Sequence, residues 1–137
     1  MTWTQFWDMS SGGGQKLSFK HCFIEAPEDE AKIVFQNRWG RNPDRVTCTC
    51  CGPDYAVHEY GSLEQATAYH RRCAFDGTLD VWIEEPERPN AEPGSWGAYS
   101  TLDAFVAREN IEVIRASDIT EGDRLGALRE EGFVWQG

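Results

Sequence analysis

The sequence predicts an α+β fold: a single compact domain over all 137 residues, with a mixed or antiparallel sheet and about three helices. Short runs of alternating apolar residues recur along the chain, separated by segments with helical spacing. Hydrophobic residues make up 40% of the chain, including six tryptophans and seven phenylalanines, which is enough for a core. The predicted order is β-α-β-β-α-β-α-β-β, and hairpins mixed with single helices argue against a doubly wound parallel sheet.

The N-terminal third is expected to hold a strand and a long helix. Segment 4–9 is predicted to form a short aromatic helix or turn, and the glycine-rich segment 10–14 a linker. Alternating apolar residues predict a strand over 17–25. Pro27 then opens a helix that Gly40 ends, with three acids in the first turn, where the helix dipole favours anions. The apolar face of this helix comprises Ala31, Val34, Phe35 and Trp39.

The middle of the chain is predicted to form a hairpin followed by a helix, together the subregion 45–75. Two strand-like runs, 45–50 and 55–60, flank a Gly-Pro-Asp turn. Ser62 caps the following helix, and Gln65 three residues later completes a capping box. One face of this helix is expected to carry Leu63, Ala66, His70 and Cys73 at helical spacing.

The C-terminal half is expected to alternate strands with loops and short helices. The predicted elements are a strand over 78–84, a long surface loop over 86–97, a helix over 101–109 capped by Ser100, a strand over 111–115, short helical turns within 118–131 and an edge strand over 133–135. The loop contains three prolines, and loops of its length are often functional.

Cysteines and histidines gather between positions 48 and 73 in a pattern that predicts a structural zinc site. The first pair has the C-x2-C spacing of a zinc knuckle and is followed by glycine, and an H-x2-C pair follows eighteen residues later. A hairpin followed by a helix can bring the two pairs together around one ion. The predicted ligands are Cys48, Cys51, His70 and Cys73, with Cys50 and His58 as alternates.

Other interpretations of this cluster remain open. Free cysteine is among the most buried residue types, so the cluster could be plain core. Cys50 with His58 as its base is the minimum for thiol catalysis, although no protease or phosphatase signature surrounds the pair. The order of the predicted hairpin, helix and ligand pairs also resembles a ββα zinc finger. The gap between the two ligand pairs is eighteen residues where about twelve is usual, however, and Cys73 replaces the last histidine. DNA recognition is therefore not expected from this resemblance.

The charge of the chain argues against direct nucleic-acid binding. Thirteen basic residues against 23 acids give a net charge of −10, which repels phosphate. Such a charge favours solubility or attraction to a basic protein surface, such as a nucleic-acid groove on an enzyme. No apolar run approaches membrane-spanning length and the start lacks a signal-peptide pattern, so a cytoplasmic location with reduced thiols is expected.

The loop over 86–97 is the predicted partner-binding surface. Trp96 and Tyr99 are the kind of aromatic side chain that dominates protein–protein hot spots. Glu87 and Glu92 surround them with negative charge, which would steer the loop towards a basic surface. Burial of Trp96 in the core is the competing expectation.

Four segments together resemble one group of small proteins encoded by tailed bacteriophages and prophages. They are WDMSSGGG at 7–14, IEAPEDEA at 24–31, TCTCCGPDY at 47–55 and QATAYHRRC at 65–73. The resemblance implies an accessory protein that acts in a bacterial cytoplasm, and it brings no enzymatic activity with it. Small acidic phage proteins often bind and block host enzymes, so the expected function is a zinc-stabilised domain that binds and inhibits a host protein. The alternatives are a small cysteine- or acid-dependent hydrolase or transferase and a self-associating assembly factor.

Overall fold

The computed structural model describes residues 2–9, 14–47, 52–71, 73–76, 81–84, 101–108 and 110–128. Its elements are β1 (Trp3–Asp8), β2 (His21–Ile24), α1 (Glu28–Trp39), β3 (Tyr55–Tyr60), α2 (Leu63–Arg71), β4 (Cys73–Asp76), β5 (Val81–Glu84), α3 (Leu102–Val106), β6 (Ile111–Ile114) and the 3₁₀ turns η2 (Ala116–Asp118) and η3 (Gly122–Arg124). This mixture of strands and helices confirms the predicted α+β class.

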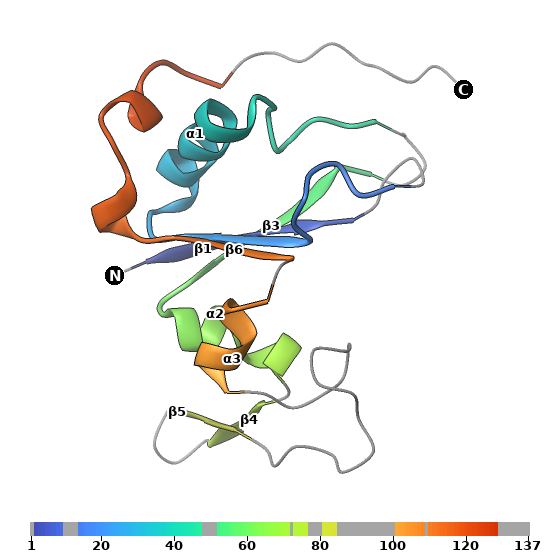
Figure 1. Cartoon of the computed structure of the whole chain (residues 1–137), viewed down its shortest axis with the longest axis vertical. Helices are drawn as coiled ribbons and strands as arrows, with labels where there is room; N and C mark the ends of the chain where they lie inside the picture. Colours follow the sequence, from blue (N-terminus) through green and yellow to red (C-terminus); the bar gives the residue numbers. More distant parts are fainter. Residues whose placement is uncertain are drawn as a thin grey trace.

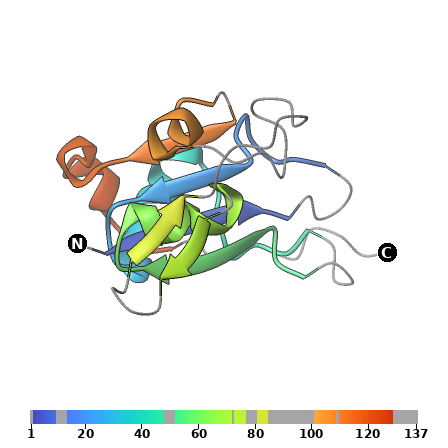
Figure 2. The same cartoon turned by 90° about the horizontal axis from the view of Figure 1, so that it is seen from below.

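A mixed four-stranded sheet with the order β3-β1-β2-β6 forms the middle of the molecule. β1 runs antiparallel to both of its neighbours, and β6 runs parallel to β2. α1 covers one face of this sheet and α2 and α3 cover the other (Figure 1). β4 and β5 form a separate antiparallel ribbon on the α2 side of the sheet. This ribbon is nearest to the viewer when the molecule is seen from below (Figure 2).

The prediction of a helix or turn over 4–9 is wrong, because this segment forms the central strand β1. Residues with even numbers, such as Phe6, face α1, whereas Trp3 packs with the cluster on the α2 and α3 side. Both faces of β1 are covered by helices, so apolar residues occur on both. A strand buried on both faces lacks the simple alternation by which strands are recognised in a sequence.

Helix α1 matches its prediction closely. Pro27 is the residue before the first helical turn, and Gly40 ends the helix in the left-handed conformation with φ of 75°. The predicted apolar face is buried at Ala31, Val34 and Phe35. The Phe35 ring stacks on Phe6 of β1 with 4.6 Å between ring centroids. This contact joins α1 to the centre of the sheet.

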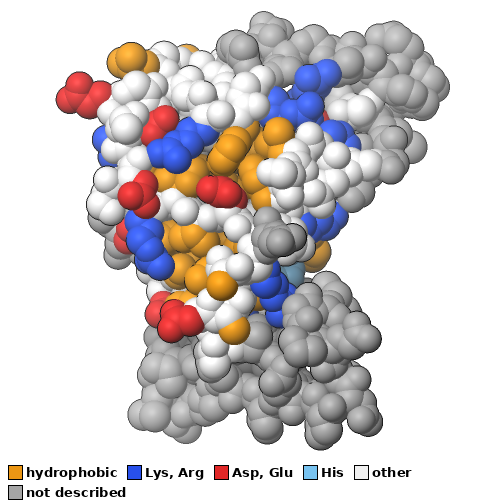
Figure 3. Space-filling view, in the orientation of Figure 1, with side chains coloured by type: hydrophobic (Ala, Val, Ile, Leu, Met, Phe, Trp, Pro, Cys, Tyr) orange, Lys and Arg blue, Asp and Glu red, His pale blue; other side chains and the backbone are white. Residues whose placement is uncertain are grey.

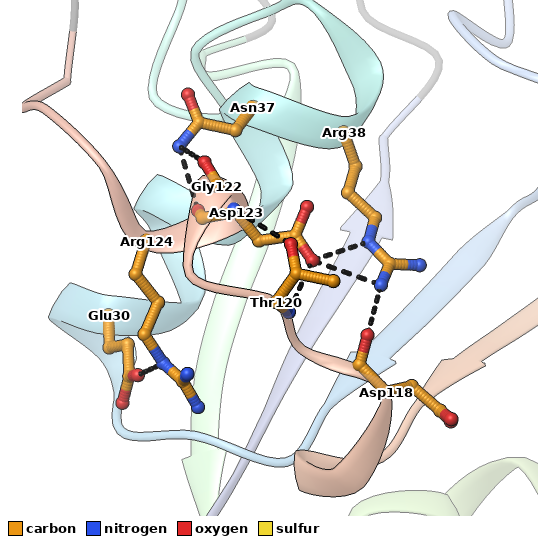
Figure 4. Close-up of polar contacts among 8 residues, drawn as sticks. All are labelled: Glu30, Asn37, Arg38, Asp118, Thr120, Gly122, Asp123 and Arg124. Carbon is orange, nitrogen blue, oxygen red and sulfur yellow. Dashed lines mark hydrogen bonds and ion pairs between the residues drawn. The ribbon is translucent and has the colours of Figure 1, made fainter.

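The polar segment after β6 is tied to the outer side of α1. Arg38 donates to the Asp123 carboxylate at 3.0 and 3.2 Å, and the backbone N–H of Thr120 donates to the same oxygen at 2.9 Å (Figure 4). Asn37 donates to the backbone carbonyl oxygens of Asp123 and Leu125 at 2.7 and 3.0 Å. The short helical turns expected in this segment are η2 and η3.

Helix α2 begins as predicted but ends earlier than the zinc interpretation assumed. Ser62 Oγ accepts from the backbone N–H of Gln65 at 3.2 Å, as a cap should. The helix ends at Arg71, and Cys73 is the first residue of β4, paired with Glu84 of β5. The prediction that His70 and Cys73 share a helix face is therefore wrong, because strand pairing begins two residues after the helix ends.

Two further local predictions need correction. Among the described residues of the predicted hairpin, the run 45–47 forms no strand, and β3 pairs with β1. Helix α3 starts at Leu102 with Thr101 as its cap, rather than Ser100, because the Thr101 hydroxyl accepts from the N–H of Ala104 at 3.2 Å. The strand prediction over 111–115 is confirmed by β6. The segments 86–97 and 133–135 lie outside the described residues.

Candidate functional site

A pocket of about 170 Å³ lies on the α2 and α3 side of the sheet. Its walls include Trp7, Lys20, His21, His70, Phe105 and Arg108. These residues come from β1, the start of β2, the end of α2, and α3 with the turn that follows it. The pocket is therefore assembled from four regions spread over about a hundred residues of sequence.

The sheet register positions the residues on the floor of the pocket. Trp7 of β1 lies opposite His21 of β2, and Gln5 lies opposite Phe23. These four residues share one face of the sheet because successive side chains of a strand point to opposite faces. The same alternation sends Phe6 and Cys22 into the apolar cluster under α1. The β1–β2 pairing thus places a polar and aromatic group directly beneath α2 and α3.

Gln5 connects the two histidines of the pocket. Its Nε2 lies 3.2 Å from His21 Nδ1 and 3.0 Å from His70 Nε2. An amide NH2 group can only donate, so both ring nitrogens act as acceptors and carry no proton. His21 is consequently protonated on Nε2 and His70 on Nδ1. The two rings lie against each other with 4.3 Å between their centroids, so one amide fixes the tautomer of both.

Burial keeps both imidazoles neutral. It lowers the pKa of His21 to about 3, with smaller contributions from His70, Lys20 and Arg108. The pKa of His70 is lowered to about 4, again by burial first and by Arg108 second. A charged ring would lose solvation and would meet positive neighbours. The pair therefore presents neutral rings with fixed hydrogen-bond directions at neutral pH.

Aromatic rings form the apolar walls of the pocket. The Trp7 and His70 rings meet edge to face at 4.8 Å, and the Phe105 ring lies nearly parallel to His70 at 6.3 Å. The Arg108 guanidinium lies over the Phe105 ring, 4.9 Å from its centroid. Lys20 also lines the pocket, and its backbone N–H donates to the carbonyl of Asn110 at 2.8 Å. Among the described lining residues the charged groups are both basic.

A second, more polar hollow lies on the same side of the sheet. It has a volume of about 280 Å³ and is lined by both signs of charge, Glu25 and Glu64 with Arg115. The Arg115 guanidinium lies over the Trp3 ring at 5.8 Å, an arrangement similar to that of Arg108 and Phe105. Basic and acidic side chains are also interspersed over the described face of the molecule in Figure 3. The two charged residues among the described lining of the first pocket are both basic, in contrast to this mixed surface.

Of the predicted site residues that the structure describes, His70 lies in this pocket. His58 occupies an exposed position of β3 opposite Gln5. Cys73 belongs to β4. The remaining predicted residues lie outside the described part of the chain: Cys48, Cys50, Cys51, Glu87, Glu92, Trp96 and Tyr99.

Sequence reasoning missed Gln5, Trp7, His21, Phe105 and Arg108 as site residues. His21 is next to a strand segment with apolar alternation, and its position two residues before Phe23 places it on the same face. The spacing of His21 and Phe23 was the one feature of the sequence that could have indicated His21 as a site residue. The partners from α2 and α3 are too distant in sequence for spacing to connect them.

Within the described residues, no group of three or more His, Cys, Asp or Glu side chains is placed to hold a metal ion. The zinc prediction is untested by this, because Cys48 and Cys51 lie outside those residues. His70 fits a zinc ligand in being neutral. Its Nε2 faces the Gln5 amide, so ligation through Nδ1 requires that amide to turn and present its oxygen. Zinc binding and the tautomers of the pocket are therefore linked.

Comparison with known proteins found no matching family model, no matching curated protein and no matching solved structure. Each helix in the described part of the chain is too short or too polar to cross a membrane. We therefore infer the function from the geometry of the pocket.

Proposed function

We propose that this chain is a non-catalytic binding protein and that the pocket between β1, β2, α2 and α3 is its recognition site. The observation that carries the proposal is the Gln5 amide, which lies within 3.0 and 3.2 Å of the two imidazoles and fixes their orientation. Fixed polar groups within aromatic walls are typical of pockets that recognise a ligand. Residues so constrained are suited to selecting a shape and a hydrogen-bond pattern.

The chemistry of the described residues supports binding over catalysis. A general acid or base works best with a pKa near the operating pH, and burial holds the pKa of His21 and His70 at about 3 and 4. Cys22 is fully buried, which raises the pKa of its thiol and removes it from attack on a substrate. The hydrolase or transferase alternative depends on Cys50, outside the described residues, with His58.

The wider proposal is a phage accessory protein that binds and inhibits a host protein in the bacterial cytoplasm. Its support is the resemblance of four segments to phage proteins and the net charge of −10, which attracts a basic surface. The loop with Trp96 and Tyr99 would contact that surface, and zinc bound by Cys48, Cys51, His70 and Cys73 would stabilise the hairpin–helix subregion. In this proposal the acidic exterior and the basic pocket contact different groups of one partner.

A capture experiment tests whether the pocket is the recognition site. Asn110 lines the pocket and is exposed, so Asn110→Trp adds a large ring at the pocket without removing a core contact. Leu125→Trp is the matched control, because it adds the same ring at a position that is 69% exposed. Both variants and the unchanged chain are used to capture proteins from a bacterial lysate at physiological salt, and bound proteins are identified by mass spectrometry.

The proposal expects one identified protein to be retained by the unchanged chain and by Leu125→Trp but lost with Asn110→Trp. The affinity is then measured by calorimetry with the purified partner. Retention of the partner by a folded Asn110→Trp variant contradicts the pocket as the recognition site. Turnover of any substrate that depends on Cys50 or His58 contradicts the non-catalytic assignment.

A further inference from the structure

We propose that the outer edge of β3 pairs with an extended, basic segment of a partner protein, which extends the central sheet by one strand. This inference goes beyond the proposed function, because it concerns a second surface and does not depend on the pocket. The pocket residue Asn110 directly precedes β6, at the other edge of the sheet. Three observations carry the inference: the open edge, the direction of its backbone groups and the charge beside it.

β3 is an edge strand of the four-stranded sheet. In the part of the chain that the structure describes, β3 pairs with β1 alone, and Figure 2 shows β3 in green along one edge of the sheet. The strand is six residues long and contains no proline. His58 and Glu59 are exposed and Val57 is half-buried, so solvent reaches this edge. An edge strand of this length is a template on which another strand can pair.

The sheet register determines which backbone groups of β3 point outward. Residues of an antiparallel pair alternate between bonding to the partner strand and facing away from it. The backbone N–H of Met9 donates to the Asp54 carbonyl oxygen at 3.0 Å, so the even-numbered residues of β3 bond to β1. Val57 and Glu59 therefore direct their backbone N–H and C=O groups away from β1. Within the described residues, these outward groups make no hydrogen bond.

The charges beside this edge favour a basic segment. The Glu59 carboxylate accepts from the backbone N–H of Glu28 at 2.8 Å, which places the acidic first turn of α1 next to the edge. Glu28 also pairs with Lys32 at 3.4 Å, so the exposed Glu59 and Asp29 are the acids that an added strand would meet. β3 itself carries no lysine or arginine. Complementary charge favours the encounter with a basic strand.

A second copy of this chain is a poorer occupant than a basic segment. Each chain has a net charge of −10, so two copies repel each other. Pairing of two β3 edges would also bring Glu59 and Asp29 of both copies into one interface. Charged residues on an edge strand are one way in which proteins prevent such self-pairing. The same acids attract a strand of opposite charge.

The side chains of β3 indicate the pattern of the added strand. Val57 packs with the apolar cluster on the α1 side, and Glu59, two residues later, faces the same side of the sheet. Side chains directly opposite each other on paired strands interact. The added strand should therefore place an apolar residue opposite Val57 and a basic residue opposite Glu59, two positions away.

Peptide titration tests this pattern. The probe is the acetylated and amidated peptide Thr-Lys-Thr-Val-Thr-Lys-Thr, whose symmetric sequence fits either strand direction. One control peptide has proline in place of valine, which keeps the charge and removes the central N–H. The other has glutamate in place of lysine, which reverses the charge.

Each peptide is titrated into the full chain while NMR follows the backbone amides of β3. We expect the probe to shift the amide signals of Val57 and Glu59 saturably. Both control peptides should bind at least about tenfold more weakly, because one lacks the hydrogen bond and the other meets like charge.

Val57→Pro blocks the edge, and Val57→Thr is its matched control. Proline is tolerated on an edge strand where the N–H faces solvent, and the Val57 N–H makes no bond to β1. We expect probe affinity to fall at least about tenfold in Val57→Pro and to be retained in Val57→Thr. Melting temperatures verify that both variants are folded.

Glu59→Gln tests the charge without altering the backbone. Glutamine keeps an oxygen for the Glu28 N–H, so the start of α1 remains capped. Probe affinity should fall about threefold, as expected for an exposed ion pair. Glu121→Gln is the matched control, because Glu121 is an exposed acid in the segment after β6, and it should leave the affinity unchanged.

Hydrogen exchange and light scattering on the free chain test whether the edge is open. The amides of Val57 and Glu59 should exchange faster than those of Ala56 and His58, which bond to β1. Slow exchange of all four amides would show that the edge is already occupied. A dimer that Val57→Pro dissociates would identify the occupant as a second copy. Either result overturns the inference.

Two results of the titration also overturn it: absence of probe binding, and equal binding of the probe and its proline control. Asn110→Trp should bind the probe as the unchanged chain does, because Asn110 lies at the other edge of the sheet. Failure of this inference is therefore distinguishable from failure of the proposed recognition site, which lysate capture with Asn110→Trp tests.

Discussion

The two faces of the β1–β2 pair have opposite characters although they belong to the same ten residues of strand. On the α1 side, Phe6, Cys22 and Ile24 have no exposed area and pack with Phe35. On the other side, Gln5 and His21 lie under the two shorter helices beside the pocket. Alternation along each strand separates a face that stabilises the fold from a face with polar groups fixed for recognition.

The difference shows what a polar buried face requires. Burial of apolar area on the α1 side stabilises by about 25 cal/mol per Å² without any geometric condition. Burial of polar groups on the other side is unfavourable unless each finds a partner. Gln5 meets that condition for one ring nitrogen of His21 and one of His70.

The largest expected effect tests whether the pocket face also contributes a zinc ligand. We predict about one zinc per chain in freshly purified protein, measured by elemental analysis. Loss of a ligand from a structural zinc site removes much of the folding free energy. Cys51→Ser should therefore lower the melting temperature far more than Cys22→Ala, which only shortens a side chain on the α1 face. Protein without zinc, or equal small shifts for both variants, would contradict the site.

The next largest effect is the loss of stability expected from a cavity on the α1 face. Phe35 is fully buried; its ring stacks on Phe6 at 4.6 Å and meets Tyr55 edge to face at 5.0 Å. Phe35→Ala should lower the free energy of unfolding by about 3–5 kcal/mol, because it leaves a cavity in a closed apolar cluster. Phe105→Ala is the comparison on the other face and should cost less, since its space joins the pocket and admits water. Urea denaturation measures both, and a larger loss for Phe105→Ala would refute the assignment of the two faces.

The third effect is a pH dependence of folding stability that arises from His21 on the pocket face. Burial first, then the electrostatic effects of His70, Lys20 and Arg108, lower the pKa of His21 to about 3 from an ordinary value of 6.5. The unfolded chain therefore binds the proton first, and stability falls as pH drops from about 6.5 towards 4. The slope due to one such histidine is about 1.4 kcal/mol per pH unit.

His21→Phe should remove this contribution from the pH dependence of unfolding between pH 6.5 and 4. His58→Phe is the control, because His58 is an exposed histidine of the same sheet that lies outside the pocket lining. The measurement is urea denaturation across that pH range. Identical slopes for the unchanged chain and His21→Phe would show that His21 is accessible to protons in the folded state.

The smallest effect concerns single hydrogen-bonding groups on the two faces of β1. Gln5→Leu leaves two buried ring nitrogens without their donor and should cost about 1–3 kcal/mol. Thr4 faces α1 and donates one hydrogen bond to the Ala26 carbonyl at 2.9 Å, so Thr4→Val should cost about 1 kcal/mol. Nitrogen NMR should also show mixed tautomers of His21 and His70 in Gln5→Leu. Retention of single tautomers would contradict the role given to Gln5.

Features defined by local chemistry were predictable from the sequence. Helix α1 begins after Pro27 and ends at Gly40, because the missing N–H of proline and the left-handed freedom of glycine act at their own positions. The Ser62 cap of α2 and the short apolar strand β6 are of the same kind. The α+β class follows from the sum of such local signals.

Only tertiary structure decided the role of β1, the end of α2 and the existence of the pocket. β1 is buried on both faces because helices cover both sides of the sheet. Its apolar residues therefore do not alternate as those of a half-exposed strand do, and the segment could not be recognised as a strand from the sequence. Helix α2 ends just before the pairing of β4 with β5 begins, and the sequence near Cys73 does not predict that pairing. The contact of Gln5 with His70 joins residues 65 positions apart, and such distant contacts depend on packing that local propensity does not specify.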